Sequence, residues 1–482
     1  MKMEHLDGFD YDAIHERAAY VLKEGKKLRP DAEAECLKWF DDHCQTSKAK
    51  IEEAKSIIPG GVQHNLANNH PWALDIVKAE GPYLYDIDGN RYIDFCCAGG
   101  PTILGNSYPP IKEAIIDEVN TCGYLTGLFN DYEYKLAQKV KEFFPSVEKF
   151  RMLGTGTESV MAAIRAARAY TGKKYIIKLK GCYHGWSDQV VYDIRACNSR
   201  GDFAAGIPEE CYKYTQAVMV NDADALEKLF IENESRGGTA AFLVEAMGQD
   251  SGCLPTTREY HHAIRELCDK YGVVLIYDEV VTAFRLALGG AQEYFHTHAD
   301  LTVFGKIIAG GLPSAGGLGG KEEIMSVLTS GVSHQASKKK IVVGGTLTAN
   351  PVSARAGYTA LCEIQKHHVP EKLDAAAEDF CDKVLGFANK YNVPAIITHQ
   401  GSVLQIDLTG MKHVTTFDTY SKEEAAAKRK EAQKRMVDFS MALAANGVIT
   451  AGGNKTFFNY ASLGVLDEAL AAYEKVFSYY AD

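Results

Sequence analysis

The stretch that decides the fold is residues 149–179, KFRMLGTGTESVMAAIRAARAYTGKKYIIKL. It begins with a short apolar run, Lys149 to Leu153, and it ends with another, Tyr175 to Leu179. Between these runs, from Ser159 to Tyr170, apolar residues recur every three or four positions, which is typical of a helix with one buried face. The stretch therefore predicts a strand, a helix and a second strand, arranged as a βαβ unit.

The same alternation continues further along the chain. Ala241 to Val244 is another apolar run, Tyr260 to Tyr271 has the spacing of a helix, and Val273 to Tyr277 is apolar throughout. Strands of a parallel sheet are buried on both faces and read as continuous apolar runs of this kind. The fold class that we predict is α/β, with an open, mostly parallel central sheet flanked by helices.

The two ends of the chain have a different pattern. Residues 1 to about 50 mix charges of both signs and predict short helices. Tyr83 to Ile93 holds two short alternating runs around the turn Asp86–Asn90, which predicts an antiparallel hairpin. Ala395 to Leu408 reads as two strands followed by helices, so we expect a separate α+β lobe beyond about residue 360.

The composition disfavours several classes of partner. The chain has 482 residues, and 52 Lys and Arg against 63 Asp and Glu give a net charge of −11, which argues against nucleic acid or an anionic membrane. No apolar run approaches the ~18–20 residues that span a bilayer, and the first residues do not read as an export signal. The 12 cysteines include no Cys-x-x-Cys pair, so we expect reduced thiols, no metal site and a cytoplasmic location.

Ligands of open α/β sheets bind at the carboxyl ends of the strands, so the residues after each predicted strand are candidates for a site. Gly154 to Ser159 follows the first strand as a loop of small residues that opens a helix. Its N–H groups and hydroxyls suit a phosphate, although a capped helix after a tight turn has the same pattern. Asp278 follows the apolar run 273–277, where a buried carboxylate requires a cationic partner such as a protonated pyridine nitrogen.

Two further candidates for this site are Lys306 and the segment Gly181–Gly185. Lys306 stands between an apolar strand and Gly310–Gly311, so it is either paired within the core or held as an imine with a carbonyl compound. In the segment, Tyr183 either stacks on a planar cofactor or packs in the turn, and His184 supplies a hydrogen bond. A phosphate loop, a stacking ring, a buried carboxylate and a buried lysine are together the parts that pyridoxal 5'-phosphate needs.

Five motifs of the chain follow the order of a known family. They are residues 152–183, 274–285, 289–292, 300–311 and 345–347. In these motifs the sequence resembles the class III pyridoxal-phosphate-dependent aminotransferases, and among them most closely the glutamate-1-semialdehyde 2,1-aminomutase subgroup. The resemblance runs from about Ile58 to about Gly357.

The resemblance implies the fold type I transferase architecture and a homodimer with shared active sites. The division that it implies is a helical appendage at 1–50, a segment at 51–110 that contributes to the small domain, a large cofactor-binding domain at 111–360 and a C-terminal small domain at 361–482. In such a dimer Thr346 would reach the phosphate in the neighbouring subunit.

The resemblance also assigns roles to individual residues. Lys306 would form the internal aldimine and carry the proton, Asp278 would hold the pyridine nitrogen protonated, and Val280 would pack on the ring face opposite Tyr183. These three, Lys306, Asp278 and Tyr183, are the expected catalytic residues. The residues expected to contact the cofactor are Thr155, Gly156, Thr157, Tyr183, His184, Glu245, Asp250, Asp278, Val280, Lys306 and Thr346.

The chain departs from the nearest subgroup on the substrate side. Ala67 stands where the subgroup has an arginine that binds the substrate carboxylate, and Asp250 stands where an asparagine is usual. Candidates for the missing clamp are His64, Arg285 and the lysine run 338–340, although Arg285 also fits a structural ion pair and the run also fits a solvated loop.

The function that we predict is amino transfer between an amino acid or amine and a keto or aldehyde acceptor, by a ping-pong mechanism. A 1,2-amino shift of the aminomutase kind and racemisation or epimerisation remain open, because all three begin at the same deprotonated centre. A cofactor-binding regulator is disfavoured, because residues 1–50 are too short and too mixed in charge for a nucleic-acid-reading module.

Overall fold

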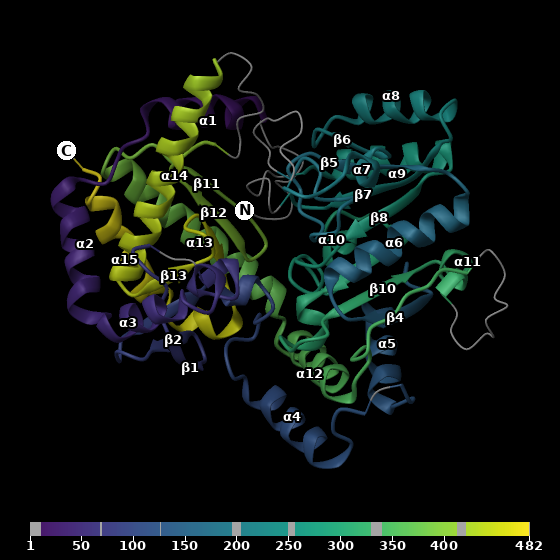
Figure 1. Ribbon diagram of the computed structural model, residues 1–482, viewed down its shortest axis with the longest axis horizontal. Coiled ribbons are helices and arrows are strands. Elements are labelled where there is room, and N and C mark those ends of the chain that lie inside the picture. Colours follow the sequence, from purple (N-terminus) through teal and green to yellow (C-terminus); the bar gives the residue numbers. More distant parts are fainter. Residues whose placement is uncertain are drawn as a thin grey trace. The chain divides into compact units, whose positions relative to one another are not determined.

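The computed structural model describes residues 11–67, 70–125, 127–194, 204–248, 256–328, 340–411 and 421–481 (Figure 1). The chain divides into two compact units. We call Pro109–Glu371 the central unit, and Asp10–Tyr108 together with Lys372–Asp482 the terminal unit. Among the described residues no helix is both long and apolar enough to cross a membrane.

The central unit is built on a seven-stranded sheet with the strand order β4-β10-β9-β8-β7-β5-β6. Its strands are β4 (Lys149–Leu153), β5 (Tyr175–Leu179), β6 (Thr215–Val218), β7 (Thr239–Glu245), β8 (Val274–Asp278), β9 (Leu301–Gly305) and β10 (Gly316–Gly320). The pairs from β9 through β6 are all parallel, whereas β10 is antiparallel to both of its neighbours. The prediction of a mostly parallel sheet in an α/β fold is confirmed.

The predicted strand–helix–strand unit is present, but its two strands are not neighbours in the sheet. The helix α6 (Gly156–Thr171) joins β4 to β5, but β10, β9, β8 and β7 lie between these two strands. Pairing between distant segments decides which strands become neighbours, and local periodicity gives no information about that pairing.

Strand β10 was not predicted, because its sequence, Gly-Gly-Leu-Gly-Gly, has little β propensity. Its glycines admit close neighbours: a Cβ at Gly316 would lie 2.5 Å from the Thr155 carbonyl oxygen, and one at Gly317 would lie 2.7 Å from the Phe150 ring. Because four of the five residues of β10 are glycines, the loop that opens α6 can lie directly against this strand.

Helices flank this sheet. They are α4 (Pro109–Thr121), α5 (Asp131–Phe143), α6, α7 (Glu209–Tyr212), α8 (Ala223–Glu234), α9 (Arg258–Tyr271), α10 (Gly290–Tyr294), α11 (Glu322–Met325) and α12 (Pro351–His367). Helix α6 lies against β7 to β10 (Figure 1). As its spacing predicts, Val160, Ala163, Ile164 and Ala167 are buried in one apolar cluster with the strands.

The terminal unit contains a four-stranded sheet, β1-β2-β3-β13, and a three-stranded sheet, β11-β12-β14. The strands are β1 (Ile76–Glu80), β2 (Tyr83–Asp86), β3 (Arg91–Phe95), β11 (Ile396–Gln400), β12 (Val403–Asp407), β13 (Val448–Thr450) and β14 (Lys455–Phe457). The predicted hairpin is the antiparallel pair β2–β3. The helices of the terminal unit are α1 (Tyr11–Glu24), α2 (Pro30–His43), α3 (Gln45–Ala54), α13 (Val369–Lys390), α14 (Lys422–Ala445) and α15 (Leu466–Ser478). Helix α13 begins three residues before Lys372, where the second part of this unit starts.

Candidate active site at the strand ends of the central unit

The loop between β4 and α6 has the structure of a phosphate cradle. Thr155 is the N-cap of α6, and its hydroxyl accepts a hydrogen bond from the Glu158 N–H at 3.1 Å. The Glu158 carboxylate in turn accepts from the Gly154 N–H at 2.8 Å, which fixes the loop. The first N–H groups of a helix have no acceptor within the helix, and the helix dipole is positive there. The start of α6 at Gly156 and Thr157 therefore suits an anionic group.

The segment that carries Tyr183 lies against this cradle. Gly185 has φ +87°, and a Cβ there would lie 2.4 Å from the Thr157 hydroxyl oxygen, so only glycine fits the approach. The Tyr183 N–H donates to the carboxylate of Glu245, the last residue of β7, at 3.2 Å. Tyr183 itself is 44% exposed, so part of this residue is accessible from outside the fold.

Asp278 ends β8 as a buried carboxylate with partners already in place. One oxygen lies 2.7 Å from Nδ1 of His184, which is also buried, and the other accepts from the Val280 N–H at 3.1 Å. The side chain of Asp278 keeps only 6% exposure. A carboxylate held in this way has a defined direction, and it is suited to hold a protonated ring nitrogen.

Lys306 follows directly after β9 and begins a short 3-10 helix, η5 (Lys306–Ala309). It is half-buried, and its φ of +50° lies in the left-handed region, which costs about 1 kcal/mol or more for a residue with a side chain. Backbone strain of this kind persists where surrounding structure enforces it, and it is frequent at functional sites.

Val280 connects these parts of the site. A Cβ at Gly156 would lie 2.8 Å from one Val280 methyl carbon, and a Cβ at Gly305 would lie 2.8 Å from the other. The two glycines therefore let Val280 pack against both the start of α6 and the end of β9. Lys306 is the residue that comes next after Gly305.

The register of the sheet aligns the strand ends. Glu245 pairs with Asp278 across β7 and β8, and Asp278 pairs with Val303 across β8 and β9. Neighbouring strands lie about 4.8 Å apart, so Glu245, Asp278 and the segment that leads to Lys306 form one edge of the sheet. This edge is where α/β proteins bind their ligands.

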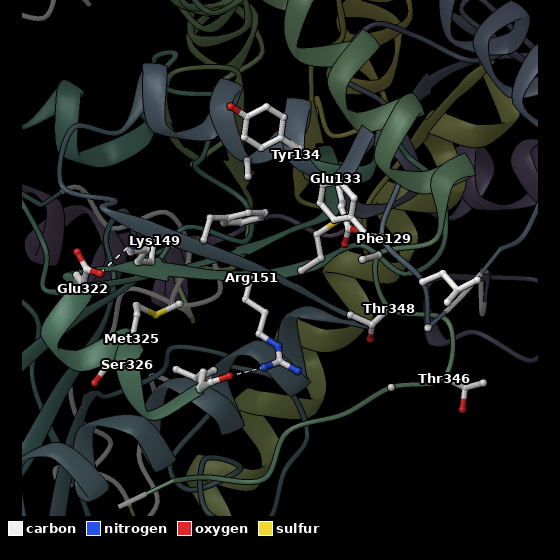
Figure 2. Close-up of a pocket in the computed structure, with 18 residues that line it drawn as sticks. Phe129, Glu133, Tyr134, Lys149, Arg151, Glu322, Met325, Ser326, Thr346 and Thr348 are labelled. Atoms are coloured by element: carbon white, nitrogen blue, oxygen red, sulfur yellow. Dashed lines mark hydrogen bonds and ion pairs between the residues drawn. The ribbon is translucent and has the colours of Figure 1, made fainter. Parts of the chain in front are cut away.

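Other expected site residues lie elsewhere. Thr346 is exposed and borders a cavity of about 940 Å³ within the central unit. Figure 2 shows Phe129, Thr348 and Thr346 on one side of the view, with Lys149, Glu322 and Met325 on the other. Arg151 of β4 also lines the cavity and donates to the Leu328 carbonyl.

The substrate-side candidates are scattered. Arg285 is completely buried in the central unit. His64 is exposed in the terminal unit, and its Nδ1 accepts from the Leu66 N–H at 3.1 Å, so it belongs to its own turn. Asp250 and Lys338–Lys339 lie outside the described residues.

Sequence reasoning missed the role of Glu279. This fully buried carboxylate accepts from the N–H groups of Ala291 at 2.9 Å and Gln292 at 3.2 Å, and from the Thr282 hydroxyl. Burial raises the pKa of Glu279 to about 7, although its hydrogen bonds oppose that shift. Glu279 thus ties the segment after β8 to the start of α10. The available signal was a second acid beside Asp278 together with the pair Gly289–Gly290.

His261 is a second missed residue, placed behind the strand ends. Its Nδ1 lies 2.6 Å from the Tyr277 hydroxyl, and its Nε2 lies 2.9 Å from the Thr256 hydroxyl. Burial lowers the pKa of His261 to about 3, so the ring is neutral. It connects the residue before Asp278 to α9.

Comparisons with known proteins show the family of the chain. A family model described as aminotransferase class-III matches residues 65–478. Glutamate-1-semialdehyde 2,1-aminomutase of Methanopyrus kandleri is 37% identical over 397 residues, which are 81% of this chain and 89% of that protein.

Solved structures are similar over most of the chain. An omega-transaminase from Sphaerobacter thermophilus has a TM-score of 0.79 at 27% identity and covers 89% of this chain and 97% of its own. A transaminase solved with PLP bound has a TM-score of 0.80 at 26% identity, with 90% and 97% covered.

The fold and the residues at the strand ends define a fold type I pyridoxal-phosphate transferase. Its phosphate cradle, its buried carboxylate and its lysine fit that cofactor. More particularly, the chain belongs to the class III aminotransferases, and it is an enzyme whose cofactor is pyridoxal 5'-phosphate.

Proposed function

We propose that this protein is an aminotransferase that moves an amino group between an amino acid or amine and a keto or aldehyde acceptor, by a ping-pong mechanism at Lys306. The observation that carries the proposal is the alignment of Glu245, Asp278 and Lys306 at the ends of three neighbouring strands. The loop at Gly156, which would take the phosphate, lies within packing distance of the same edge through Val280.

When bound, pyridoxal phosphate supplies an aldehyde and a ring that accepts electrons from a deprotonated carbon. The Lys306 amine would hold the cofactor through its aldehyde group and, when free of it, would take the proton from the substrate α-carbon and return it one position away. The Asp278 carboxylate, which His184 and the Val280 N–H orient, would keep the ring nitrogen protonated. Tyr183 and Val280 would pack against the ring, and Thr155 to Thr157 would hold the phosphate.

A 1,2-amino shift is the second candidate, because the relative from Methanopyrus kandleri is an aminomutase at 37% identity. Intermolecular transfer is favoured by the substrate-side departures. Ala67 ends a short 3-10 helix, η3 (Asn65–Ala67), and its methyl group cannot bind the carboxylate that an arginine would hold. A changed substrate side beside a retained cofactor side indicates a different amino compound.

The test is an amino-donor screen of the purified yellow enzyme. In amino transfer, a donor alone removes the visible absorbance of the lysine-bound cofactor, and a keto acid added afterwards restores it. Conversion of glutamate-1-semialdehyde to its isomer with no external acceptor would instead establish the 1,2-shift. Inversion of an enantiopure amino acid without net transfer would establish racemisation.

We propose that a second copy of the chain covers the cavity beside Thr346. Leu128, Phe129 and Leu347 line or border it and are 67%, 77% and 55% exposed, an apolar surface that monomers rarely leave open. With a second copy there, Thr346 would complete the partner's phosphate site.

The oligomeric state tests this part of the proposal. Phe129→Asp should weaken self-association about 30-fold or more, measured by sedimentation, because it places a charge at an apolar contact. The control is Ile231→Asp, on the exposed face of α8. A wild-type chain that sediments as a monomer would refute the shared site.

A further inference from the structure

The two faces of the central sheet have different neighbours at the ends of β7 and β8. Side chains alternate between the two faces along each strand. On one face, Leu243 of β7 and Ile276 of β8 are buried in the same apolar cluster as residues of α6. Glu245 and Asp278 stand two positions further along these strands, so they lie on this face as well. Tyr277 therefore lies on the opposite face.

His261 lies against this opposite face. It belongs to α9, which packs against β8. Its Nδ1 lies 2.6 Å from the Tyr277 hydroxyl oxygen. Its Nε2 lies 3.2 Å from the Ala246 carbonyl oxygen and 2.9 Å from the Thr256 hydroxyl oxygen. One imidazole thus contacts β8, the residue that follows β7, and the residue before the N-cap of α9.

The hydrogen bonds of this group define the protonation of the ring. The Thr256 hydroxyl donates to the Ala246 carbonyl at 2.5 Å, because a carbonyl oxygen can only accept. Nε2 of His261 therefore carries the hydrogen that it directs at these two oxygens, and Nδ1 accepts from the Tyr277 hydroxyl. The lowered pKa of His261, about 3, agrees with a neutral ring that carries no proton to the reaction.

Packing also fixes the imidazole. His261 is fully buried, and Phe295 stacks on it with the ring centroids 4.0 Å apart and an interplanar angle of 25°. The Tyr260 ring lies against it at 6.0 Å, at an angle of 67°. A buried polar group whose hydrogen bonds are all made rigidifies its surroundings. The ring therefore has a single orientation.

The residues that His261 holds are direct chain neighbours of the two carboxylates at the strand ends. Ala246 follows Glu245, and Tyr277 precedes Asp278. Glu245 accepts from the Tyr183 N–H at 3.2 Å. A shift of the backbone at 246 or 277 would therefore turn both carboxylates, although His261 touches neither of them.

We propose that His261 is a positioning residue, which fixes the directions of Glu245 and Asp278 toward the cofactor from the far face of the sheet. The inference rests on the roles that the proposed function gives to Asp278 and Tyr183. Misplacement of reacting groups by about 1 Å costs up to about 100-fold in rate, so a contact that fixes two strand ends has a measurable effect on catalysis.

His261→Leu is the first test, because it removes both hydrogen bonds at a similar side-chain size. We expect kcat to fall about 10- to 100-fold, with KM for the amino donor nearly unchanged. Titration of the full-length enzyme, freed of cofactor, with pyridoxal phosphate should show an affinity about 10-fold lower, together with a changed circular dichroism of the bound cofactor. Unchanged affinity and circular dichroism would overturn the proposal.

The matched control is His262→Leu, the same substitution at the next position of α9. His262 is exposed, and its Nε2 lies 3.0 Å from the His296 carbonyl oxygen, away from the strand ends. This variant should keep the cofactor affinity and the circular dichroism of the wild type. A loss equal to that of His261→Leu would show that the effect does not come from the strand ends, and the proposal would be rejected.

A double variant separates positioning from stabilisation of the fold. His261→Leu leaves the buried Tyr277 hydroxyl without its partner, so Tm should fall. Adding Tyr277→Phe removes that hydroxyl, while the Ala246 carbonyl still accepts from Thr256, so most of the Tm should return. The cofactor affinity should stay low, because the link between the two strand ends is still absent. Recovery of affinity together with Tm would mean that His261 only stabilises the fold.

His261→Gln tests the same link by partial rescue. Its amide nitrogen can reach about the position of Nε2 and donate to the Ala246 carbonyl, so the cofactor affinity should lie between those of the wild type and of His261→Leu. An affinity no higher than that of His261→Leu would contradict the role of this contact.

Asp278→Asn distinguishes failure of this inference from failure of the proposed function. If Asp278→Asn changes the cofactor affinity but His261→Leu does not, the inference fails and the proposed function stands. If the wild-type enzyme takes up pyridoxal phosphate but no amino donor changes its visible absorbance, the proposed function fails, whereas the cofactor titrations still decide whether His261 positions the strand ends.

Discussion

Buried polar groups of the central unit and of the terminal unit differ in whether the chain supplies their partners. At the strand ends of the central unit, Asp278 accepts from His184 and from Val280, at 2.7 and 3.1 Å. On one face of the three-stranded sheet of the terminal unit, the buried side-chain amides of Gln400 and Gln405 have no hydrogen-bond partner among the described residues. The first arrangement gives a carboxylate a defined direction, and the second leaves buried amide groups without compensation for their lost water.

This difference separates polar groups that are oriented for a ligand from polar groups that lower the stability of the fold. Preorganised groups bind a ligand that is always the same, because their orientation has already been determined by folding. Buried polar groups without partners reduce stability, because they lose their water without a hydrogen bond in return. The predictions below test whether the strand ends are organised in the way that their hydrogen bonds indicate.

The largest expected effect is that of Lys306→Ala. We expect turnover to fall about 10⁴-fold or more, because no other amine at the end of β9 can take and return the proton. The measurement is single-turnover loss of a donor amino group together with the visible spectrum. Lys383→Ala, which removes an exposed ion pair with Asp379 on α13, is the control. A Lys306→Ala enzyme with wild-type turnover would refute the role of this lysine.

Asp278→Asn should have the next largest effect. A neutral amide still accepts from the Val280 N–H but does not keep a ring nitrogen protonated, so we expect turnover to fall about 10²- to 10³-fold. Asp269→Asn, at an exposed carboxylate of α9, is the control. If Asp278→Asn leaves turnover and cofactor affinity unchanged, the carboxylate is structural only.

Glu279→Gln tests the buried, hydrogen-bonded carboxylate of Glu279 through the pH dependence of the free energy of unfolding. The pKa of Glu279 is raised to about 7 in the folded protein from an ordinary value of 4.5, so the folded state binds the proton more tightly than the unfolded state. The contribution of Glu279 to stability is therefore present below about pH 4.5 and is lost as the pH rises to about 7, by about 3 kcal/mol in total.

Urea unfolding at pH 5, 6, 7 and 8 measures this effect. The glutamine variant lacks the titration, so its stability should fall less than that of the wild type between pH 5 and 7. Parallel pH profiles for the two proteins would contradict the assignment of the buried proton to Glu279.

Gly156→Ala should have the smallest effect. The added Cβ would lie 2.8 Å from a Val280 methyl carbon, so Val280 must shift, and we expect cofactor affinity to fall about 10-fold. Adding Val280→Ala should restore part of the loss, because the double variant removes the clash. Additive effects of the two substitutions would show that Gly156 and Val280 do not act through this contact.

Local sequence signals predicted most of the individual elements. Continuous apolar runs predicted β7 and β8, helical spacing predicted α6 and α9, and a turn between alternating runs predicted the β2–β3 hairpin. Such signals are visible because burial on one or both faces leaves a periodic trace. Strand β10 left none, since its glycines are selected by the close approach of Thr155 and Phe150 and not by burial of side chains.

The sequence by itself determined the residue types of the candidate site: small residues at 154–157, Tyr183 and His184, Asp278, and Lys306 after an apolar strand. These are recognisable because each follows a strand, and the chemistry of a phosphate, a ring and an aldehyde limits the residues that serve. Only the tertiary structure decided which strands are neighbours, that His184 binds Asp278 and that Glu279 anchors α10. The physical reason is that packing of the whole unit chooses these partners: His184 and Asp278, for example, are 94 positions apart in the chain.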